Sequence, residues 1–310
     1  MNKILNNRVA VLLAAYNGEA YLQEQIDTIV NQVDVYVDIF ISLDASTDNS
    51  LELLRRLSSE HENIYLLDQV KVFGSAGQNF FHLLMNVDFS GYAYVAFADQ
   101  DDIWLKNKLR RAIDEIESRN IDGYSSNVIA FWEDGSQKLI HKSSPQVEFD
   151  YLFESAGPGC TFVMSLRLAT AIKQSLNGNR ENLSMLWLHD WFCYAFARKN
   201  NFEWYIDPNS FMFYRQHSAN SVGANSGFKS LTKRVGSVFS GDAFEKVLAQ
   251  ADFLDAFDKK PIQYIKHGSF FSVWKLLWFS SSCRRKNKDK ILFFMAVALS
   301  SIKGGRGWGK

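Results

Sequence analysis

Short apolar runs alternate with amphipathic stretches over the first third of the chain. The runs at residues 9–15, 37–43, 64–67 and 92–98 predict buried strands. The stretches at 20–31, 48–59, 78–87 and 105–119 have the spacing of apolar residues that predicts helices. Strands joined in this way by crossover helices indicate an α/β fold with a mainly parallel central sheet flanked by helices.

The later part of the chain is less regular. The turn residues Glu133-Asp134-Gly135 predict a hairpin, and Gly157-Pro158-Gly159 predicts a second turn. An aromatic-rich helix is expected at 185–199, with strands at 202–206 and 211–215. Beyond Ser226 the pattern becomes helical, with apolar and basic residues interleaved at 270–279 and 291–302. We therefore expect a domain of residues 1–225 and a basic helical C-terminal extension of residues 226–310.

Charged residues are balanced over the whole chain but unevenly distributed along it. Lys+Arg and Asp+Glu both total 34, which gives no argument for binding nucleic acid. Residues 1–228 carry 18 basic and 28 acidic side chains, whereas residues 229–310 carry 16 basic and 6 acidic ones. The chain thus combines an acidic body with a basic tail.

Cysteine usage and the apolar runs bear on the cellular compartment. The three cysteines are odd in number and far apart, which predicts free thiols in a reducing, cytoplasmic environment. The run at 9–15 follows Lys3 and Arg8 as in a short signal peptide, but it leads directly into Tyr16 and favours a first strand. The apolar run at 291–299 is shorter than the ~20 residues that a membrane-spanning helix needs, so no transmembrane segment is expected.

Polar residues follow three of the predicted strands. They are Tyr16-Asn17-Gly18, Asp44-Ala45-Ser46-Thr47-Asp48 and Asp99-Gln100-Asp101-Asp102. Parallel sheets bind ligands at the carboxyl ends of their strands, so these residues form the candidate site. Ser46, Thr47 and Asp48 also carry the oxygens that cap the helix expected after them.

The acidic turn after the fourth strand admits two interpretations. Asp99, Asp101 and Asp102 offer hard oxygen ligands that suit Mg²⁺ or Mn²⁺ with a diphosphate. The alternative is a solvated acidic turn in which Asp102 caps the next helix. Asp44 is suited to accept the N3 hydrogen of uracil or thymine, or else serves as an ordinary turn residue. The loop from Gly74 to Asn79 precedes a helix and can bring backbone N–H groups near phosphate or ribose.

The ordered set of motifs resembles glycosyltransferase family 2, which has the GT-A fold. The set is Ala15-Tyr16-Asn17-Gly18, Asp44-Ala45-Ser46-Thr47-Asp48, Asn79 and Asp99-Gln100-Asp101-Asp102-Ile103-Trp104, and the resemblance covers about residues 8–220. Members commonly carry two acids at the end of the second strand, but Leu43 replaces the first here. The resemblance implies that donor nucleotide and sugar are bound by Ala15, Tyr16, Asn17, Asp44, Gln78, Asn79, Asp99 and Gln100.

Three further motifs resemble those of bacterial rhamnosyltransferases within this family. They are Asp-Gln-Asp-Asp-Ile-Trp, His189-Asp190-Trp191 and Tyr214-Arg215-Gln216-His217. The resemblance implies that Asp99 binds the donor sugar or ribose and that Asp101 holds the metal, with His217 completing its shell. A hydrogen-bonded histidine at a strand end is the alternative for His217.

Asp190 is the expected catalytic base, since families of this type invert the anomeric centre by a single displacement. Its apolar surroundings in the sequence suit a partly desolvated carboxylate that takes a proton. The alternative is a structural contact of Asp190 with His189 or with an arginine. The resemblance implies that the acceptor side of the site is formed by Gly159, Cys160, Trp104, His189 and Trp191.

The resulting expectation is an inverting glycosyltransferase that moves L-rhamnose from dTDP-rhamnose to a glycan or lipid-linked glycan of the bacterial surface. The alternatives are a UDP-hexose donor and a degenerate scaffold protein that only binds nucleotide-sugar. A nucleotidyltransferase would need a Gly-rich loop with Lys or Arg before Asp44, and a dehydrogenase would need G-x-G-x-x-G after the first strand. The segment from Arg284 to Lys288 is expected either to contact the inner face of the cell membrane or to form a solvated loop.

Overall fold

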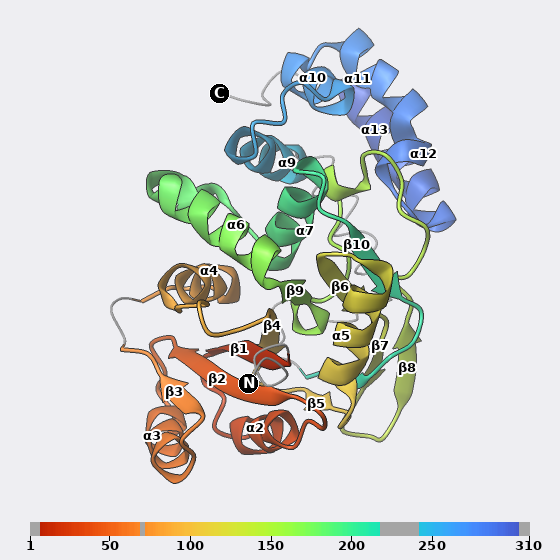
Figure 1. The fold of residues 1–310 in the computed structure, drawn as a ribbon. Helices are drawn as coiled ribbons and strands as arrows, with labels where there is room; N and C mark the ends of the chain where they lie inside the picture. The colour runs from red at the N-terminus through yellow and green to blue at the C-terminus, as the bar shows by residue number, and fades with distance from the viewer. Residues whose placement is uncertain (1–6, 69–71, 218–241, 304–310) are drawn as a thin grey trace. The chain divides into compact units, whose positions relative to one another are not determined.

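The alternation of strands and helices is present in the computed structural model, which describes residues 7–68, 72–217 and 242–303 (Figure 1). The chain forms two units. Unit 1 consists of Met1–Ser143, Ala156–Leu183 and Leu188–Gly223, and unit 2 of Ser144–Ser155, Ser184–Trp187 and Ala224–Lys310. The domain boundary expected between residues 225 and 226 lies outside the described residues.

Unit 1 contains a seven-stranded sheet in the order β10-β6-β9-β4-β1-β2-β3. All of its pairings are parallel except those of β9. The interior strand β1 is an apolar run buried on both faces, as strands covered by helices on both sides must be. The bounds are β1 Arg8–Ala15, β2 Tyr36–Leu43, β3 Ile64–Leu66, β4 Tyr94–Asp99, β6 Gly123–Ser126, β9 Val163–Ser165 and β10 Trp204–Asp207.

Helices cover this sheet on both sides. Figure 1 shows α4 and α6 on one side of the strands β1 and β2, and α2 and α3 on the other. Each buries the apolar face expected from its sequence, as Leu22, Ile26 and Ile29 do on α2. The bounds are α2 Leu22–Val30, α3 Ser50–Glu60, α4 Ala76–Asn86, α5 Lys108–Arg119, α6 Leu166–Gly178 and α7 His189–Lys199.

The predicted capping of α3 is wrong for two of its three residues. Ser46 Oγ accepts from the backbone N–H of Asn17 at 3.0 Å, and the Thr47 N–H donates to Asn17 Oδ1 at 2.8 Å. Asp48 alone serves the start of α3, where its Oδ1 accepts from the Ser50 N–H at 3.1 Å. Ser46 and Thr47 therefore fix the turn after β1 instead of the helix.

A smaller second sheet in unit 1 has the order β5-β11-β7-β8. The expected hairpin joins β7 to β8, and Gly135 takes the positive φ of 81° that its turn requires. The bounds are β5 Ile103–Trp104, β7 Val128–Phe131, β8 Gln137–Ile140 and β11 Met212–Arg215.

Two antiparallel pairings bring distant segments to the end of β4. β9 runs antiparallel to β4, with Val163 opposite Ala96, so the residues just before β9 lie beside the carboxyl end of β4. β11 runs antiparallel to β5, with Met212 opposite Trp104. The residues after β11 therefore lie beside the residues just before β5, which are the acidic turn.

Unit 2 is helical, and the segment Ser144–Ser155 packs into it through a buried ion pair. Arg285 Nη1 lies 3.1 Å from Asp150 Oδ2, and both side chains are almost fully buried. The Phe149 N–H also donates to the Ser282 carbonyl at 2.8 Å. The bounds are α9 Asp242–Phe253, α10 Lys260–His267, α11 Phe270–Leu276, η4 Leu277–Phe279, α12 Ser280–Cys283, α13 Asn287–Lys303 and the 3-10 turn η1 Asp150–Leu152.

Two expectations about the whole chain were also tested. Cys160, Cys193 and Cys283 are free and buried, which confirms the predicted thiols. Among the described residues, no helix is long and apolar enough to span a bilayer.

Candidate functional site

The turn after β1 is held against the acidic turn by a paired amide. Gln100 Oε1 accepts from the Tyr16 N–H at 2.8 Å, and Gln100 Nε2 donates to the Tyr16 carbonyl at 2.9 Å. Gly18 leaves room for this contact, since a Cβ at that position would come within 2.4 Å of Gln100 Oε1. Asn17 next to it adopts a positive φ of 46°. The side chain of Tyr16 remains exposed at the edge of the sheet.

Asp44 joins the end of β2 to the loop before α4. Its Oδ1 accepts from the N–H groups of Ala45 and Phe73, and its Oδ2 accepts from the Gly74 N–H, all at 2.8 Å. A carboxylate has about four lone-pair positions, and the described residues occupy three of them, which leaves one on Oδ2. The Gly74 N–H, expected near phosphate or ribose, is therefore directed at Asp44.

Asn79 and Gln78 on α4 also have partners within the protein. Asn79 Nδ2 donates to the Ser42 carbonyl at 2.9 Å and to the Ala15 carbonyl at 3.4 Å, which ties α4 to the ends of β1 and β2. Gln78 Nε2 donates to the Leu183 carbonyl at 2.9 Å. Among the described residues, the buried Asn79 Oδ1 has no hydrogen-bond partner. The donor-binding role of both residues stays a prediction.

The acidic turn after β4 brings Asp101 together with His217, although the two are 116 positions apart in the sequence. His217 Nε2 lies 2.7 Å from Asp101 Oδ2, and the imidazole stacks on Tyr21 at 5.1 Å between ring centroids. Arg215 fixes this arrangement from β11, because its Nε donates to the Asp101 carbonyl at 2.8 Å and its N–H donates to Asp102 Oδ1 at 3.2 Å. The pairing of β11 with β5 accounts for the approach.

A cluster of buried ionisable groups lies against this turn. Asp99, Asp102 and Cys160 place their ligand-type atoms within 4.8 Å of one another. Burial raises the pKa of Asp99 to about 7, and the charges of Asp101 and Asp190 act in the same direction. Burial likewise raises the pKa of Asp102 well above its usual value.

Cys160 suits Mg²⁺ or Mn²⁺ less well than oxygen and nitrogen donors do, because these cations prefer hard ligands and its sulfur is soft. Burial raises the pKa of its thiol well above the usual value. Asp101 and His217 offer a better pair, because a carboxylate oxygen and an imidazole nitrogen already lie in close approach, and the buried Asp102 Oδ2 beside them has no hydrogen-bond partner among the described residues. These residues fit a divalent cation.

Lys108 completes the cluster and was not singled out by the sequence. It is the first residue of α5, and its Nζ lies 3.4 Å from the centroid of the Trp104 ring. Burial lowers the pKa of Lys108 to about 7, while the charges of Cys160 and Asp102 oppose that shift. Among the described residues, Nζ has no hydrogen-bond partner. Trp104, expected on the acceptor side, is buried beneath this lysine.

His189 and Asp190 open α7 and face the turn before β9. The buried His189 ring stacks on Phe80 with centroids 3.9 Å apart, and burial lowers its pKa to about 3, so the ring is neutral. A Cβ on Gly159 would come within 2.3 Å of His189 Nε2 and 3.3 Å of Asp190 Cβ. The half-buried Asp190 accepts from the Trp191 N–H at 2.6 Å through Oδ1. The expected acceptor-side turn and the expected base thus lie together.

Asp190 is also close enough to the acidic turn for its charge to raise the pKa of Asp99. The structure therefore gathers the acidic turn, His217, Asp190 and Gly159 at one edge of the sheet. Trp191, like Trp104, is buried, which leaves little of either ring for contact with an acceptor.

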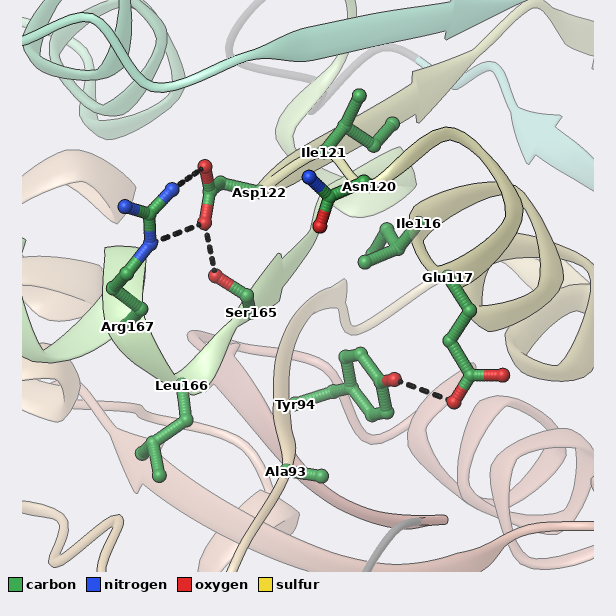
Figure 2. Close-up of a pocket in the computed structure, with 10 residues that line it drawn as sticks. All are labelled: Ala93, Tyr94, Ile116, Glu117, Asn120, Ile121, Asp122, Ser165, Leu166 and Arg167. Atoms are coloured by element: carbon green, nitrogen blue, oxygen red, sulfur yellow. Dashed lines mark hydrogen bonds and ion pairs between the residues drawn. The ribbon is translucent and has the colours of Figure 1, made fainter.

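A cavity of about 520 Å³ lies at the opposite ends of the strands and is separate from this site. Figure 2 shows that both of its carboxylates are paired: Asp122 accepts from Ser165 Oγ and from Arg167 Nε, each at 2.9 Å, and the Tyr94 hydroxyl donates to Glu117 at 3.0 Å. No carboxylate there is left without a partner.

The chain resembles known proteins in sequence. The model of Glycosyl transferase family 2 matches residues 10–176. Over 294 residues the chain is 41% identical to the dTDP-rhamnosyl transferase RfbG of Shigella flexneri, and the match covers 93% of this chain and 99% of that protein.

Solved structures share the fold at low sequence identity. The crystal structure of S. aureus TarS 1–349 has a TM-score of 0.55 at 15% identity and covers 93% of this chain and 78% of that chain. The mannosyltransferase PcManGT from Pyrobaculum calidifontis, in complex with GDP-Man and Mn²⁺, has a TM-score of 0.50 at 13% identity and covers 97% and 88%. The expected GT-A fold is confirmed.

Proposed function

We propose a donor and a reaction for this chain, which belongs to glycosyl transferase family 2. It transfers L-rhamnose from dTDP-rhamnose to a hydroxyl of a growing bacterial surface polysaccharide. The observation that carries the proposal is the gathering of Asp101, His217 and Asp190 at one edge of the sheet. The identity to a dTDP-rhamnosyl transferase over almost the whole chain supports rhamnose as the sugar.

The proposed base is Asp190. Its carboxylate takes the proton of the acceptor hydroxyl while the acceptor oxygen bonds to the anomeric carbon of rhamnose. The bond between that carbon and the diphosphate oxygen breaks, and dTDP leaves with the electron pair. Attack from the face opposite the leaving group inverts the anomeric centre. Gly159 beneath His189 and Asp190 supports this role, since it lets the turn before β9 approach the base closely.

Asp101 and His217 are the proposed holders of a divalent cation, Mg²⁺ or Mn²⁺. When bound, the cation offsets the negative charge of the leaving diphosphate. Arg215 and Asp102 orient the two ligands from behind, through the backbone of the acidic turn and of β11.

Donor recognition is assigned to the ends of β1 and β2. The remaining lone pair of Asp44 Oδ2 accepts the N3 hydrogen of thymine, and the exposed Tyr16 ring lies at the same edge of the sheet. Uracil offers the same hydrogen, so this contact accepts a UDP-sugar equally well. Discrimination must therefore come from the C5 methyl group of the base, the 2′ position of the ribose or the transferred sugar.

We place the activity at the cytoplasmic side of the cell membrane, with a glycan or lipid-linked glycan as acceptor. Unpaired buried cysteines and the basic C-terminal region support this location. We also propose that residues 1–225 carry the transferase site and that residues 226–310 form the helical extension.

A thermal-shift panel of nucleotide sugars, with and without Mn²⁺, tests the donor. A ligand that binds the folded state raises the unfolding temperature, so dTDP-rhamnose should give a larger shift than UDP-glucose, and Mn²⁺ should enlarge it. A larger shift with a UDP-hexose would show that the donor is a UDP-hexose and not dTDP-rhamnose. No shift with any nucleotide sugar would refute donor binding, whereas a shift without donor hydrolysis would favour the scaffold that only binds nucleotide-sugar.

Asp190→Asn tests the mechanism. The variant keeps the shape of the side chain but removes the proton acceptor, so turnover should fall ~10²–10⁴-fold while the dTDP-rhamnose shift is retained. Asp101→Ala should instead abolish the effect of Mn²⁺ on that shift. Glu181→Gln, at an exposed carboxylate before α7, is the matched control. Near-normal turnover of Asp190→Asn would show that the base is another group.

A further inference from the structure

Unit 2 exposes large apolar side chains on two helices that pack against each other, α11 and α13. On α11 and the turn that follows it they are Phe270, Phe271, Trp274 and Trp278, and on α13 they are Ile291, Phe294, Met295 and Leu299. These eight residues are called the α11–α13 face below.

The spacing shows that each helix is apolar on two sides. Phe270, Trp274 and Trp278 recur every four positions and so share one side of α11, while Val273 and Leu276 on its other side are buried. On α13 the exposed set recurs in the same manner, opposite the buried Ala296 and Val297. A helix that is apolar all round is normally covered on all sides.

The exposure is too large for scattered surface residues. Phe271 on α11 and Trp278 on the following turn η4 are 74% and 76% exposed, and seven positions separate them. Exposed apolar side chains in this number on two packed helices point to association with a protein or a membrane.

The charge around the face favours an anionic partner. Residues 260–303 contain nine Lys or Arg and a single acid, Asp289. Lys275 and Lys288 are exposed on the two helices. Arg285 is buried and paired with Asp150, so its charge does not reach the surface. The segment expected to contact the membrane, from Arg284 to Lys288, therefore offers less free charge than its sequence indicates.

A second copy of this chain is a poorer partner. A two-fold symmetric contact places the same patch on both sides of the interface, which would bring the lysines of both copies together with only Asp289 of each copy to oppose them. Aromatic side chains with lysines around them are instead the combination found where helices lie in the headgroup region of a bilayer.

We propose that the α11–α13 face inserts into the headgroup region of an anionic lipid bilayer, with α11 and α13 lying along its surface. Trp274, Trp278 and the phenylalanines enter the boundary between headgroups and acyl chains. Lys275 and Lys288 contact the anionic headgroups. The inference rests on the proposed membrane location but is independent of the sugar donor.

Vesicle flotation of the full chain tests the apolar contact. The probes are vesicles that contain phosphatidylglycerol with phosphatidylcholine, and vesicles of phosphatidylcholine alone. Phe271→Ser combined with Trp278→Ser should weaken binding to the anionic vesicles at least about tenfold, since each lost ring removes buried apolar surface. Leu139→Ser, at a similarly exposed apolar residue on β8, should bind as the wild type does.

The charge contribution is tested separately. Lys275→Glu combined with Lys288→Glu should reduce binding to anionic vesicles by about fivefold or more per lysine, and added salt should reduce wild-type binding. Arg55→Glu, an exposed arginine on α3 in unit 1, is the matched control. Binding to phosphatidylcholine alone should be weak in all variants.

Three outcomes would overturn the proposal. If the wild-type protein does not bind anionic vesicles, the proposed membrane location is refuted. Binding that survives both double variants would place the contact elsewhere on the chain. A wild-type dimer in light scattering that Phe271→Ser with Trp278→Ser converts to a monomer would identify a second copy as the occupant. A retained donor-induced thermal shift shows that each variant is folded and that the donor site is intact.

Discussion

Lys108 is expected to lower the stability of this protein at neutral pH, and Lys108→Met should relieve that effect. Its ammonium group is buried at the first residue of α5, where the helix dipole also disfavours a positive charge. Its Nζ lies over the face of the Trp104 ring and has no hydrogen-bond partner among the described residues. Methionine keeps a similar volume and removes the charge.

The pH dependence follows from the two pKa values. Lys108 has a pKa of about 7 in the folded protein against an ordinary 10.5. Between these values the unfolded chain binds the proton and the folded protein releases it, so the free energy of unfolding of the wild type rises with pH. From about pH 7 to about pH 9 the rise relative to Lys108→Met should be ~2 kcal/mol.

Urea denaturation followed by far-UV circular dichroism at both pH values measures this difference. The variant should be more stable than the wild type at pH 7, by up to ~4 kcal/mol less the ~1 kcal/mol of the lost contact with Trp104. The difference in free energy of unfolding between Lys108→Met and the wild type should be smaller at pH 9. Lys106→Met, at an exposed lysine two positions earlier, should show no such trend. A gap between Lys108→Met and wild type that is equal at both pH values would refute a near-neutral pKa for Lys108.

Three further variants probe close contacts in unit 1. Gly18→Ala forces a Cβ against Gln100 and should lower the free energy of unfolding by ~1–3 kcal/mol in urea titrations, with partial recovery when Gln100→Ser is added. Gly159→Ala should displace His189 and lower kcat without changing the Kd for dTDP in calorimetry, so a changed Kd with normal kcat would contradict the placement of that turn. Asp44→Asn loses an acceptor of backbone N–H groups and should weaken dTDP binding about tenfold or more, whereas unchanged affinity would remove Asp44 from donor recognition.

The sequence predicted the strands of the parallel half closely because each is a continuous apolar run. The predicted strand at 9–15 is observed as Arg8–Ala15, and that at 37–43 as Tyr36–Leu43. The antiparallel β9 was not predicted, since its three residues are too few to show a period. The assignment of Ser144–Ser155 to unit 2 was not predicted. Asp150 of this segment forms a buried pair with Arg285, and no local sequence pattern reveals such a pair.

The candidate site was predictable only where a motif marks it. Asp101 and His217 were paired through the family resemblance, and their contact is created by the register of β11 on β5, which spacing alone does not give. The burial of Lys108 was not predicted, because nothing in the local sequence distinguishes Lys108 from Lys106. Only the fold buries Lys108 and leaves Lys106 exposed. Gln100 was expected to touch the donor, but both ends of its amide bind the backbone of Tyr16.

The position of β9 has a consequence for synthesis of the chain. β4 pairs with β1 on one side, and its other side is covered only by β9, which begins at Val163. Until the ribosome has released that segment, the folded half built around β1 and β4 presents an open, apolar sheet edge, the kind of surface that recruits strands from other chains. Fragments that end between β4 and β9 should therefore aggregate, whereas fragments that extend past α6 should remain dispersed in a pelleting assay.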